Sequence, residues 1–145
     1  MAMSLKDAKI IEMTRYLDDL DRAAKAGQSS FERAFNSPPK GLSVHEIDTQ
    51  KKFVRVSPAH RGLLGYNPSE MVGRSPLDYV VMRGLSESAT SRKLTAGAML
   101  VPNTRSFSKA DGTEITLLQV ERHLKDDLGK VVGIRTVITE APKEV

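Results

Sequence analysis

The stretch from 111 to 140, DGTEITLLQVERHLKDDLGKVVGIRTVITE, most constrains how this chain folds. Asp111-Gly112 is a turn pair, because glycine accepts a positive φ and aspartate tolerates it. A β-rich run follows to about Leu124, residues 125–130 are polar, and Val131 to Thr139 are rich in β-branched side chains. This pattern predicts the last two strands of an antiparallel sheet.

A hairpin centred on Leu128 predicts which side chains share a face of these two strands. It places Val120 opposite Thr136 and Glu121 opposite Arg135, with β-carbons about 4.5–5.5 Å apart. One face is then mostly apolar, and the other has a charged and polar middle. The predicted apolar face carries Leu118, Val120, Leu124, Val132, Ile134 and Ile138.

Three further strands are predicted upstream, at about 42–47, 53–56 and 101–110. Short helices are expected between the second and third of them, because glycine and proline are frequent from Pro58 to Pro76. Strands at both ends with helices between them predict an α+β domain built on a five-stranded antiparallel sheet.

Three helices are expected within this frame. Ser29-x-x-Glu32 is a capping box that opens a short helix. Asn67 followed by Pro68 opens another. A longer helix runs from residue 82 to about residue 96, and its apolar side chains lie roughly on one face. That face carries Met82, Leu85, Ala89 and Ala96.

The first element is a helix over residues 4 to about 26. Its apolar side chains recur every three to four residues and form one narrow stripe. The stripe consists of Ile10, Met13, Leu17, Leu20 and Ala24. Such a helix either packs on its own domain or pairs with a second copy, and both arrangements can occur together.

Composition favours a binding module over an enzyme. The chain lacks cysteine, which excludes disulfides and thiolate chemistry, and its three histidines have no metal-ligand spacing. No phosphate-binding glycine motif or nucleophile motif is present. The net charge of +4 is scattered, so no nucleic-acid contact is expected. No apolar run reaches about 18 residues and no signal core opens the chain, so we expect a cytoplasmic protein without membrane contact.

Three segments together resemble the PAS (Per-Arnt-Sim) sensor domain: FERAFNSPPKGLSVHEID, VSPAHRGLLGYNPSEMVGRSPLDYV, and KADGTEI with GKVVGIRTVITE. The resemblance covers about residues 28 to 140. It implies that short helices and one longer helix cover one face of the sheet and enclose a small pocket. It divides the chain into a flanking helix (1–27), the sensor domain (28–140) and a tail (141–145) toward an output domain.

The resemblance also implies a role and a partner set. The expected function is a sensory module of a histidine kinase, a cyclic-di-nucleotide enzyme or a transcriptional regulator. The module is expected to bind a small ligand and to relay the signal through homodimer contacts. The alternative is a ligand-free scaffold for homodimerisation or protein–protein interaction. Light-sensing members use a cysteine, haem-binding members use a histidine on the long helix, and flavin-redox members tend to use a tryptophan. The chain lacks all three features, so neither haem nor flavin is expected.

By resemblance, the pocket faces Leu117, Gln119, Glu121 and Arg135, and the apolar hairpin face is the outer one. The first helix is expected to cover that outer face in a homodimer. The residues expected in this packing are Ile10, Met13, Leu17, Leu20, Leu118, Val120, Val132 and Ile134. Glu121 and Arg135 form either a structural ion pair or an anchor for an anionic ligand such as a small carboxylate.

Overall fold

The computed structural model describes residues 3–95 and 97–143, so the predicted helix end at Ala96 and the last two tail residues lie outside the described chain. A five-stranded antiparallel sheet has the strand order β2-β1-β5-β4-β3. The strands are β1 (Ser43–Asp48), β2 (Phe53–Val56), β3 (Asn103–Ser108), β4 (Glu114–Lys125) and β5 (Val131–Glu140). The predicted α+β class and the five strands are confirmed.

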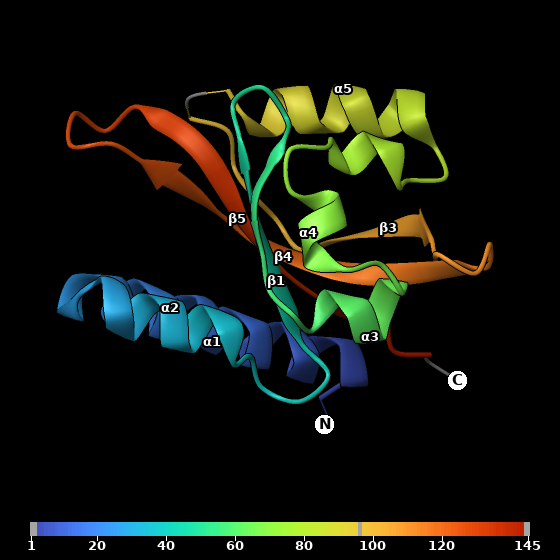
Figure 1. Ribbon diagram of the computed structural model, residues 1–145, viewed down its shortest axis with the longest axis horizontal. Coiled ribbons are helices and arrows are strands. Elements are labelled where there is room, and N and C mark those ends of the chain that lie inside the picture. The colour runs from blue at the N-terminus through green and yellow to red at the C-terminus, as the bar shows by residue number, and fades with distance from the viewer. Residues whose placement is uncertain (1–2, 96, 144–145) are drawn as a thin grey trace.

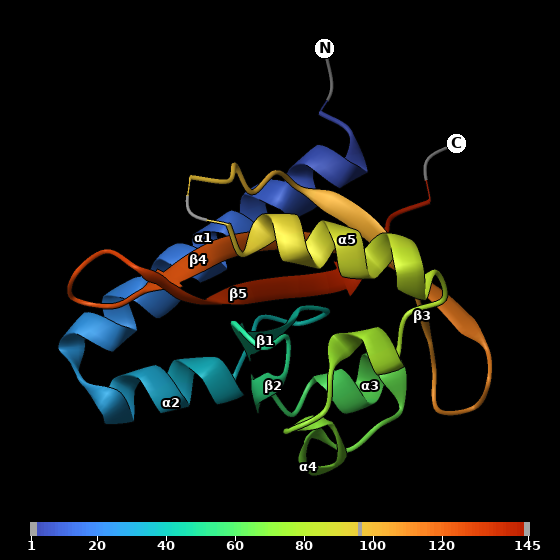
Figure 2. The same ribbon diagram turned by 90° about the horizontal axis from the view of Figure 1, so that it is seen from above.

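Helices cover both faces of this sheet. Figure 1 shows α1 and α2 on one side, and α3, α4 and α5 on the other. Seen from above, α5 lies along β4 and β5 (Figure 2). The helices are α1 (Leu5–Ala26), α2 (Gln28–Asn36), α3 (His60–Leu64), α4 (Pro68–Met71), the 3-10 turn η1 (Pro76–Asp78) and α5 (Arg83–Lys93).

The predicted capping box does not form. Helix α2 already begins at Gln28, and its N-cap is Gly27, which supplies no side-chain hydrogen bond. Ser29 therefore lies inside the first turn and is not the cap. The reason is the sharp turn at Gly27, where a φ of +140° lets α2 start with a single residue between it and α1.

A β-bulge sets the register of the β4–β5 hairpin. Lys125 pairs with Val131 as a turn centred on Leu128 requires, but the next pair is Leu124 with Gly133. Val132 is the extra residue of β5. Because side chains alternate along a strand, this one-residue shift places each later side chain of β5 on the face opposite to the predicted one.

The predicted faces of β4 are therefore right and those of β5 are wrong. Leu118 and Val120 lie on the outer face, and Leu117 lies on the inner face. Ile134, predicted to pack against the first helix, instead belongs to the inner core. Val132 is 43% exposed at the bulge and belongs to neither core.

Gly133 follows the bulge and has no room for a side chain. A β-carbon there would lie 2.2 Å from the Ile47 carbonyl oxygen on β1. We expect Gly133→Ala to lower the free energy of unfolding by about 1–3 kcal/mol, since overpacked positions shift the backbone. Urea denaturation measures the change. Gly84→Ala is the control, because a β-carbon in α5 meets nothing within 4 Å there and alanine favours the helix by up to about 1 kcal/mol.

The outer face of the sheet carries a core of its own. Met13, Leu17 and Leu20 of α1 are 0–1% exposed and pack against apolar side chains of β4 and β5. The predicted stripe is confirmed, with two differences at its margin: Tyr16 is buried in it, whereas Ala24 is exposed. The helix thus covers the outer face of its own chain, with Ile10 partly buried beside the core.

The inner face packs against α3, α4 and η1, but α5 contributes little apolar surface to it. The buried residues of α5 are Ser86 and Thr90. Met82 and Leu85 are 59% and 69% exposed, so the apolar side chains of this helix face solvent. The polar side of α5 faces inward because the sheet beneath it is polar at this point.

Candidate functional site

A polar cluster lies on the inner face of β4 beneath α5, centred on Glu121. One of its carboxylate oxygens lies 2.5 Å from Lys93 Nζ of α5 and accepts a hydrogen bond from Asn103 Nδ2 at 2.9 Å. The other oxygen accepts from the Thr136 hydroxyl of β5 at 2.9 Å. The side chain of Glu121 is only 6% exposed, so these three donors replace the water that the carboxylate loses.

Arg105 of β3 adds a second cation to this cluster. Within the described chain it forms no salt bridge, and its guanidinium donates to the Thr90 hydroxyl at 3.4 Å. Burial lowers the pKa of Arg105, and the charge of nearby Glu121 partly offsets this effect. With Lys93 and Arg105 against one carboxylate, the cluster has an excess of positive charge.

A small cavity opens among these side chains, with a volume of about 20 Å³. Gln119 lines it, and the Gln119 Oε1 atom is buried without a hydrogen-bond partner in the described part of the chain. Such a cavity holds about one water molecule. The residues around it are His45, Ile47, Pro76, Thr90, Lys93, Arg105, Phe107, Gln119, Glu121, Ile134 and Thr136.

A buried chain of hydrogen bonds ends at this cavity. The Ser57 and Ser43 hydroxyl oxygens are 2.6 Å apart, and Ser43 Oγ lies 2.5 Å from His60 Nδ1. His60 Nε2 lies 3.0 Å from His45 Nδ1. His45 also packs edge-on against the Phe53 ring, at 4.9 Å between centroids. The four polar side chains of this chain are all buried.

One direction of this chain satisfies its donors and acceptors. In it the Ser57 hydroxyl accepts from the Val44 N–H at 3.1 Å and donates to Ser43. Ser43 then donates to His60 Nδ1, and His60 Nε2–H donates to His45 Nδ1. In this arrangement every hydroxyl hydrogen has an acceptor, and His45 keeps its Nε2–H as a donor at the cavity wall.

Acid should destabilise the protein through these two histidines. Burial lowers the pKa of His45 from 6.5 to about 3 and holds that of His60 well below 6.5. Their stabilising effect is complete above pH 6.5, and it decreases as the pH falls, because only the unfolded chain then binds the protons. For each histidine we expect the free energy of unfolding to fall by about 1.4 kcal/mol in total between pH 7.5 and 5.5, with the slope increasing as the pH falls below 6.5.

Urea denaturation between pH 7.5 and 5.5 measures this slope above the range in which carboxylates titrate. His45→Phe removes one of the two groups and can pack against Phe53, so its slope should be about half that of the wild type. An equal slope in the variant would show that His45 does not contribute.

Three of the four predicted pocket residues lie on the inner face, and two of them line the cavity. Leu117 lies in the inner apolar core, and Gln119 and Glu121 line the cavity. Arg135 does not join them, because the bulge turns it to the outer face. Arg105, Lys93 and His45 are cavity residues that the sequence reasoning missed. One signal for Arg105 was available: side chains alternate between the two faces of a strand, so Arg105 lies on the same face as the apolar Phe107.

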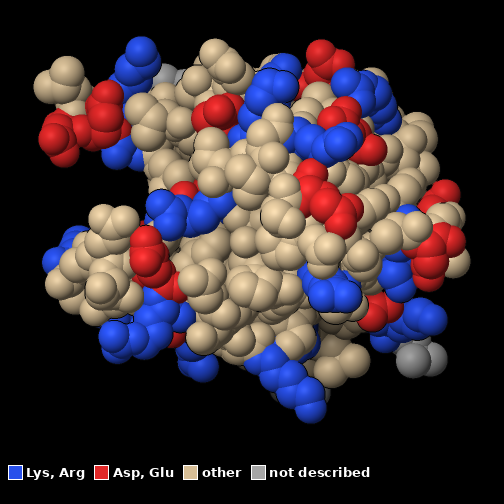
Figure 3. Space-filling model, viewed as in Figure 1, with Lys and Arg blue, Asp and Glu red and all other residues tan. Residues whose placement is uncertain are grey.

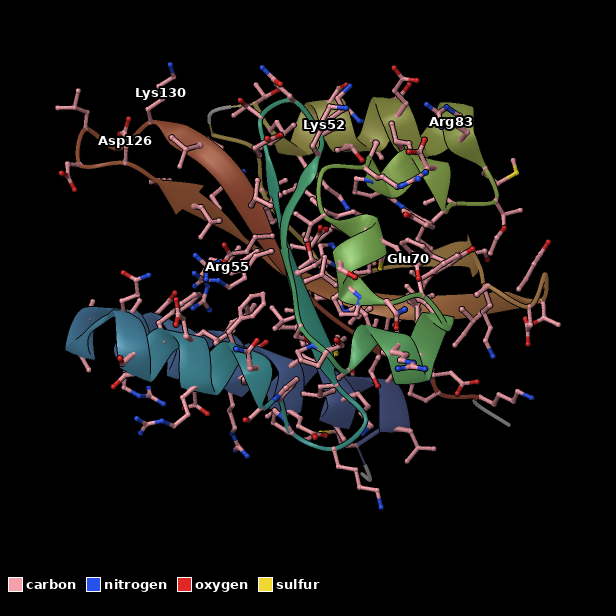
Figure 4. The ribbon with its side chains drawn as sticks, viewed as in Figure 1. Lys52, Arg55, Glu70, Arg83, Asp126 and Lys130 are labelled. Carbon is pink, nitrogen blue, oxygen red and sulfur yellow. The ribbon has the colours of Figure 1, made fainter. Side chains whose placement is uncertain are left out.

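On the outer face, Arg135 takes part in a different ion network. Its Nε donates to Glu46 of β1 at 2.8 Å, and its Nη1 donates to Asp21 of α1 at 3.0 Å. The guanidinium carbon lies 4.8 Å from the centroid of the Phe31 ring. Arg55 of β2 points toward α2 (Figure 4) and lies 3.5 Å from Glu46. The predicted Glu121–Arg135 pair, and with it the Arg135 anchor for a ligand, is therefore wrong.

The described residues offer no cluster of three or more side chains suited to a metal ion. Among the helices described, none is both long and apolar enough to span a bilayer. Basic and acidic side chains are interspersed on the face seen in Figure 3. The inner cavity is smaller than the surface grooves of this chain, but charged side chains and the Gln119 Oε1 atom, which has no partner among the described residues, line it and make it the candidate binding site.

Comparison with protein-family models finds no match, and comparison with curated protein sequences finds none either. The fold, in contrast, is similar to many solved structures. A PAS domain from Colwellia psychrerythraea matches with a TM-score of 0.67 and 15% identity, over 77% of this chain and 94% of that one.

The PAS domain of an HTR-like protein from Haloarcula marismortui matches with a TM-score of 0.64 and 16% identity, over 88% of this chain and 98% of that one. The PAS-B domain of Drosophila melanogaster Cycle, solved with bound ethylene glycol, matches with a TM-score of 0.58 and 16% identity, over 67% and 97% of the two chains. At these identities the likeness shows the fold alone, and the predicted PAS fold is confirmed.

Proposed function

We propose that this chain is the sensory module of a signal-transduction protein and binds a small polar ligand in the cavity beneath α5. The output is expected from a histidine kinase, a cyclic-di-nucleotide enzyme or a transcriptional regulator, in the same chain or in a partner. A cytoplasmic location and the absence of catalytic activity of its own belong to the same proposal.

The observation that supports this function is the polar cluster inside the inner core. Two cations, one carboxylate and the Gln119 amide cost stability when they are buried, and an apolar core would avoid that cost. The buried Gln119 Oε1 also needs a donor that the described residues do not supply. Groups that weaken a core in this way are typical of binding sites.

The cavity volume limits what binds without rearrangement. A space of about 20 Å³ holds about one water molecule, so a small organic ligand enters only when the surrounding side chains move. It is far below the roughly 300–1,000 Å³ of pockets that enclose drug-sized ligands, so it does not fit a haem or flavin. We therefore propose that no coloured cofactor is present. The ethylene glycol bound to Cycle PAS-B supports the proposal that a ligand of this fold can be much smaller than a haem or flavin.

Native mass spectrometry of the purified chain tests the proposal, together with an absorption spectrum. We expect an added mass that belongs to a small organic molecule and no Soret or flavin bands. Gln119→Leu should remove the added mass, because it fills the polar position with an apolar side chain. An added mass that survives this replacement would contradict a ligand in this cavity.

The second candidate is a ligand-free scaffold for dimerisation, which the small cavity volume favours. Homodimerisation stays a prediction, and the stripe on α1 is already buried under its own sheet. A dimer would therefore use other surface. Wild-type protein that carries no added mass and sediments as a dimer over micromolar concentrations would support this candidate.

A further inference from the structure

The apolar face of α5 borders a groove between this helix and the edge strand β3. The groove has a volume of about 330 Å³, which is within the range of ligand pockets. Met82, Leu85 and Ala89 supply its apolar wall. Because Met82 and Leu85 are 59% and 69% exposed, the helix leaves this surface uncovered in the single chain.

Two cations stand at the inner end of the groove. Lys93 and Arg105 line both this groove and the buried cavity, so they separate the two spaces. Lys93 is paired with Glu121, whereas the one hydrogen bond of the Arg105 guanidinium among the described residues goes to the Thr90 hydroxyl at 3.4 Å. An anion placed here would meet a guanidinium that already lies partly out of water, where charge-assisted hydrogen bonds are strong.

Beyond its hydrogen bonds with residues 79–81, the outer edge of β3 adds a backbone donor. Val81 N–H donates to the Ser106 carbonyl, and Ser108 N–H donates to the Tyr79 carbonyl, so these residues present their backbone groups to the edge. Alternation along the strand then places the N–H of Thr104, which lines the groove, on the same edge. The groove therefore combines an apolar wall with donors at one end.

We propose that this groove binds an amphipathic monocarboxylate, with its carboxylate at Arg105 and its hydrocarbon chain along Met82, Leu85 and Ala89. The inference rests on the proposed sensory function and adds a second ligand site outside the buried cavity. The charge balance favours it, because one negative charge neutralises the excess cation of the cluster.

Isothermal titration calorimetry with octanoate tests this assignment on the whole chain. We expect saturable binding of one octanoate per chain, and at least tenfold weaker binding of neutral octanamide and of acetate. Arg105→Met should weaken octanoate binding at least tenfold. Leu85→Ser should weaken it about three- to tenfold without loss of folding, because the side chain is exposed.

Each variant has a matched control. Arg92→Met removes a charge from an exposed position of the same helix, outside the groove, and should leave the affinity within twofold. Leu128→Ser removes a leucine that is 94% exposed in the β4–β5 turn and should also have no effect. No octanoate binding, or equal weakening by Arg105→Met and Arg92→Met, would overturn the assignment.

Two further outcomes separate this inference from others. If native mass spectrometry shows a ligand that Gln119→Leu removes while octanoate does not bind, the sensory function stands and the groove assignment fails. If sedimentation shows a wild-type dimer that Leu85→Ser converts to a monomer, a second copy covers the groove, and the assignment also fails.

Discussion

Arg135→Met should lower the free energy of unfolding by about 3–5 kcal/mol, as expected when one partner of a buried ion pair is removed. The side chains of Arg135 and Glu46 are each 8% exposed and lie 2.8 Å apart across β5 and β1. Without the guanidinium, Glu46 keeps one basic partner among the described residues, Arg55 at 3.5 Å. Asp21 loses its contact with Arg135 and keeps the one with Arg122, so an ion pair between α1 and the sheet is lost at the same time.

Urea denaturation of single and double variants measures the effect. Glu46→Gln combined with Arg135→Met should cost less than the sum of the two single changes, because neither charge is then stranded. Arg122→Met is the control, since this side chain is 35% exposed and its contacts to Asp18 and Asp21 should contribute at most about 1 kcal/mol. Additive costs at Glu46 and Arg135 would contradict the coupled pair.

The Glu46–Arg135 pair could not be predicted from the sequence pattern. Binary patterning located the strands, their order in the chain and the stripe on α1, because burial alternates with period two or about 3.6. The bulge at Val132 leaves no such signal. One extra residue in β5 moves each later side chain to the opposite face of the sheet. The ion partner of Arg135 could therefore not be found from the pattern.

The candidate site was predictable only where it lies on β4. The prediction that Leu117, Gln119 and Glu121 share the inner face of β4 was right, because no bulge interrupts β4 at these positions. Lys93, His45 and His60 come from three other elements, and their approach depends on how α5 and α3 dock on the sheet. No local pattern encodes that docking, and α5 reverses the usual rule by facing the sheet with Ser86 and Thr90.

Leu17→Asp should abolish the folded state or detach α1 from the sheet, which is the largest effect we expect from one substitution. Leu17 is 1% exposed in the outer core. Truncation of a buried leucine alone costs about 2–5 kcal/mol, and an unpaired carboxylate buried there adds a desolvation penalty. Since a domain is typically stable by only about 5–15 kcal/mol, most of the available stability is lost.

Circular dichroism and urea denaturation measure this loss, and Ile11→Asp is the matched control on the same helix. Ile11 is 38% exposed, so its replacement should change the free energy of unfolding by about 0.5 kcal/mol or less. Sedimentation decides between the two roles of the helix. If Leu17→Asp leaves the stability unchanged and converts a dimer to monomers, α1 pairs with a second copy in solution and does not cover its own sheet.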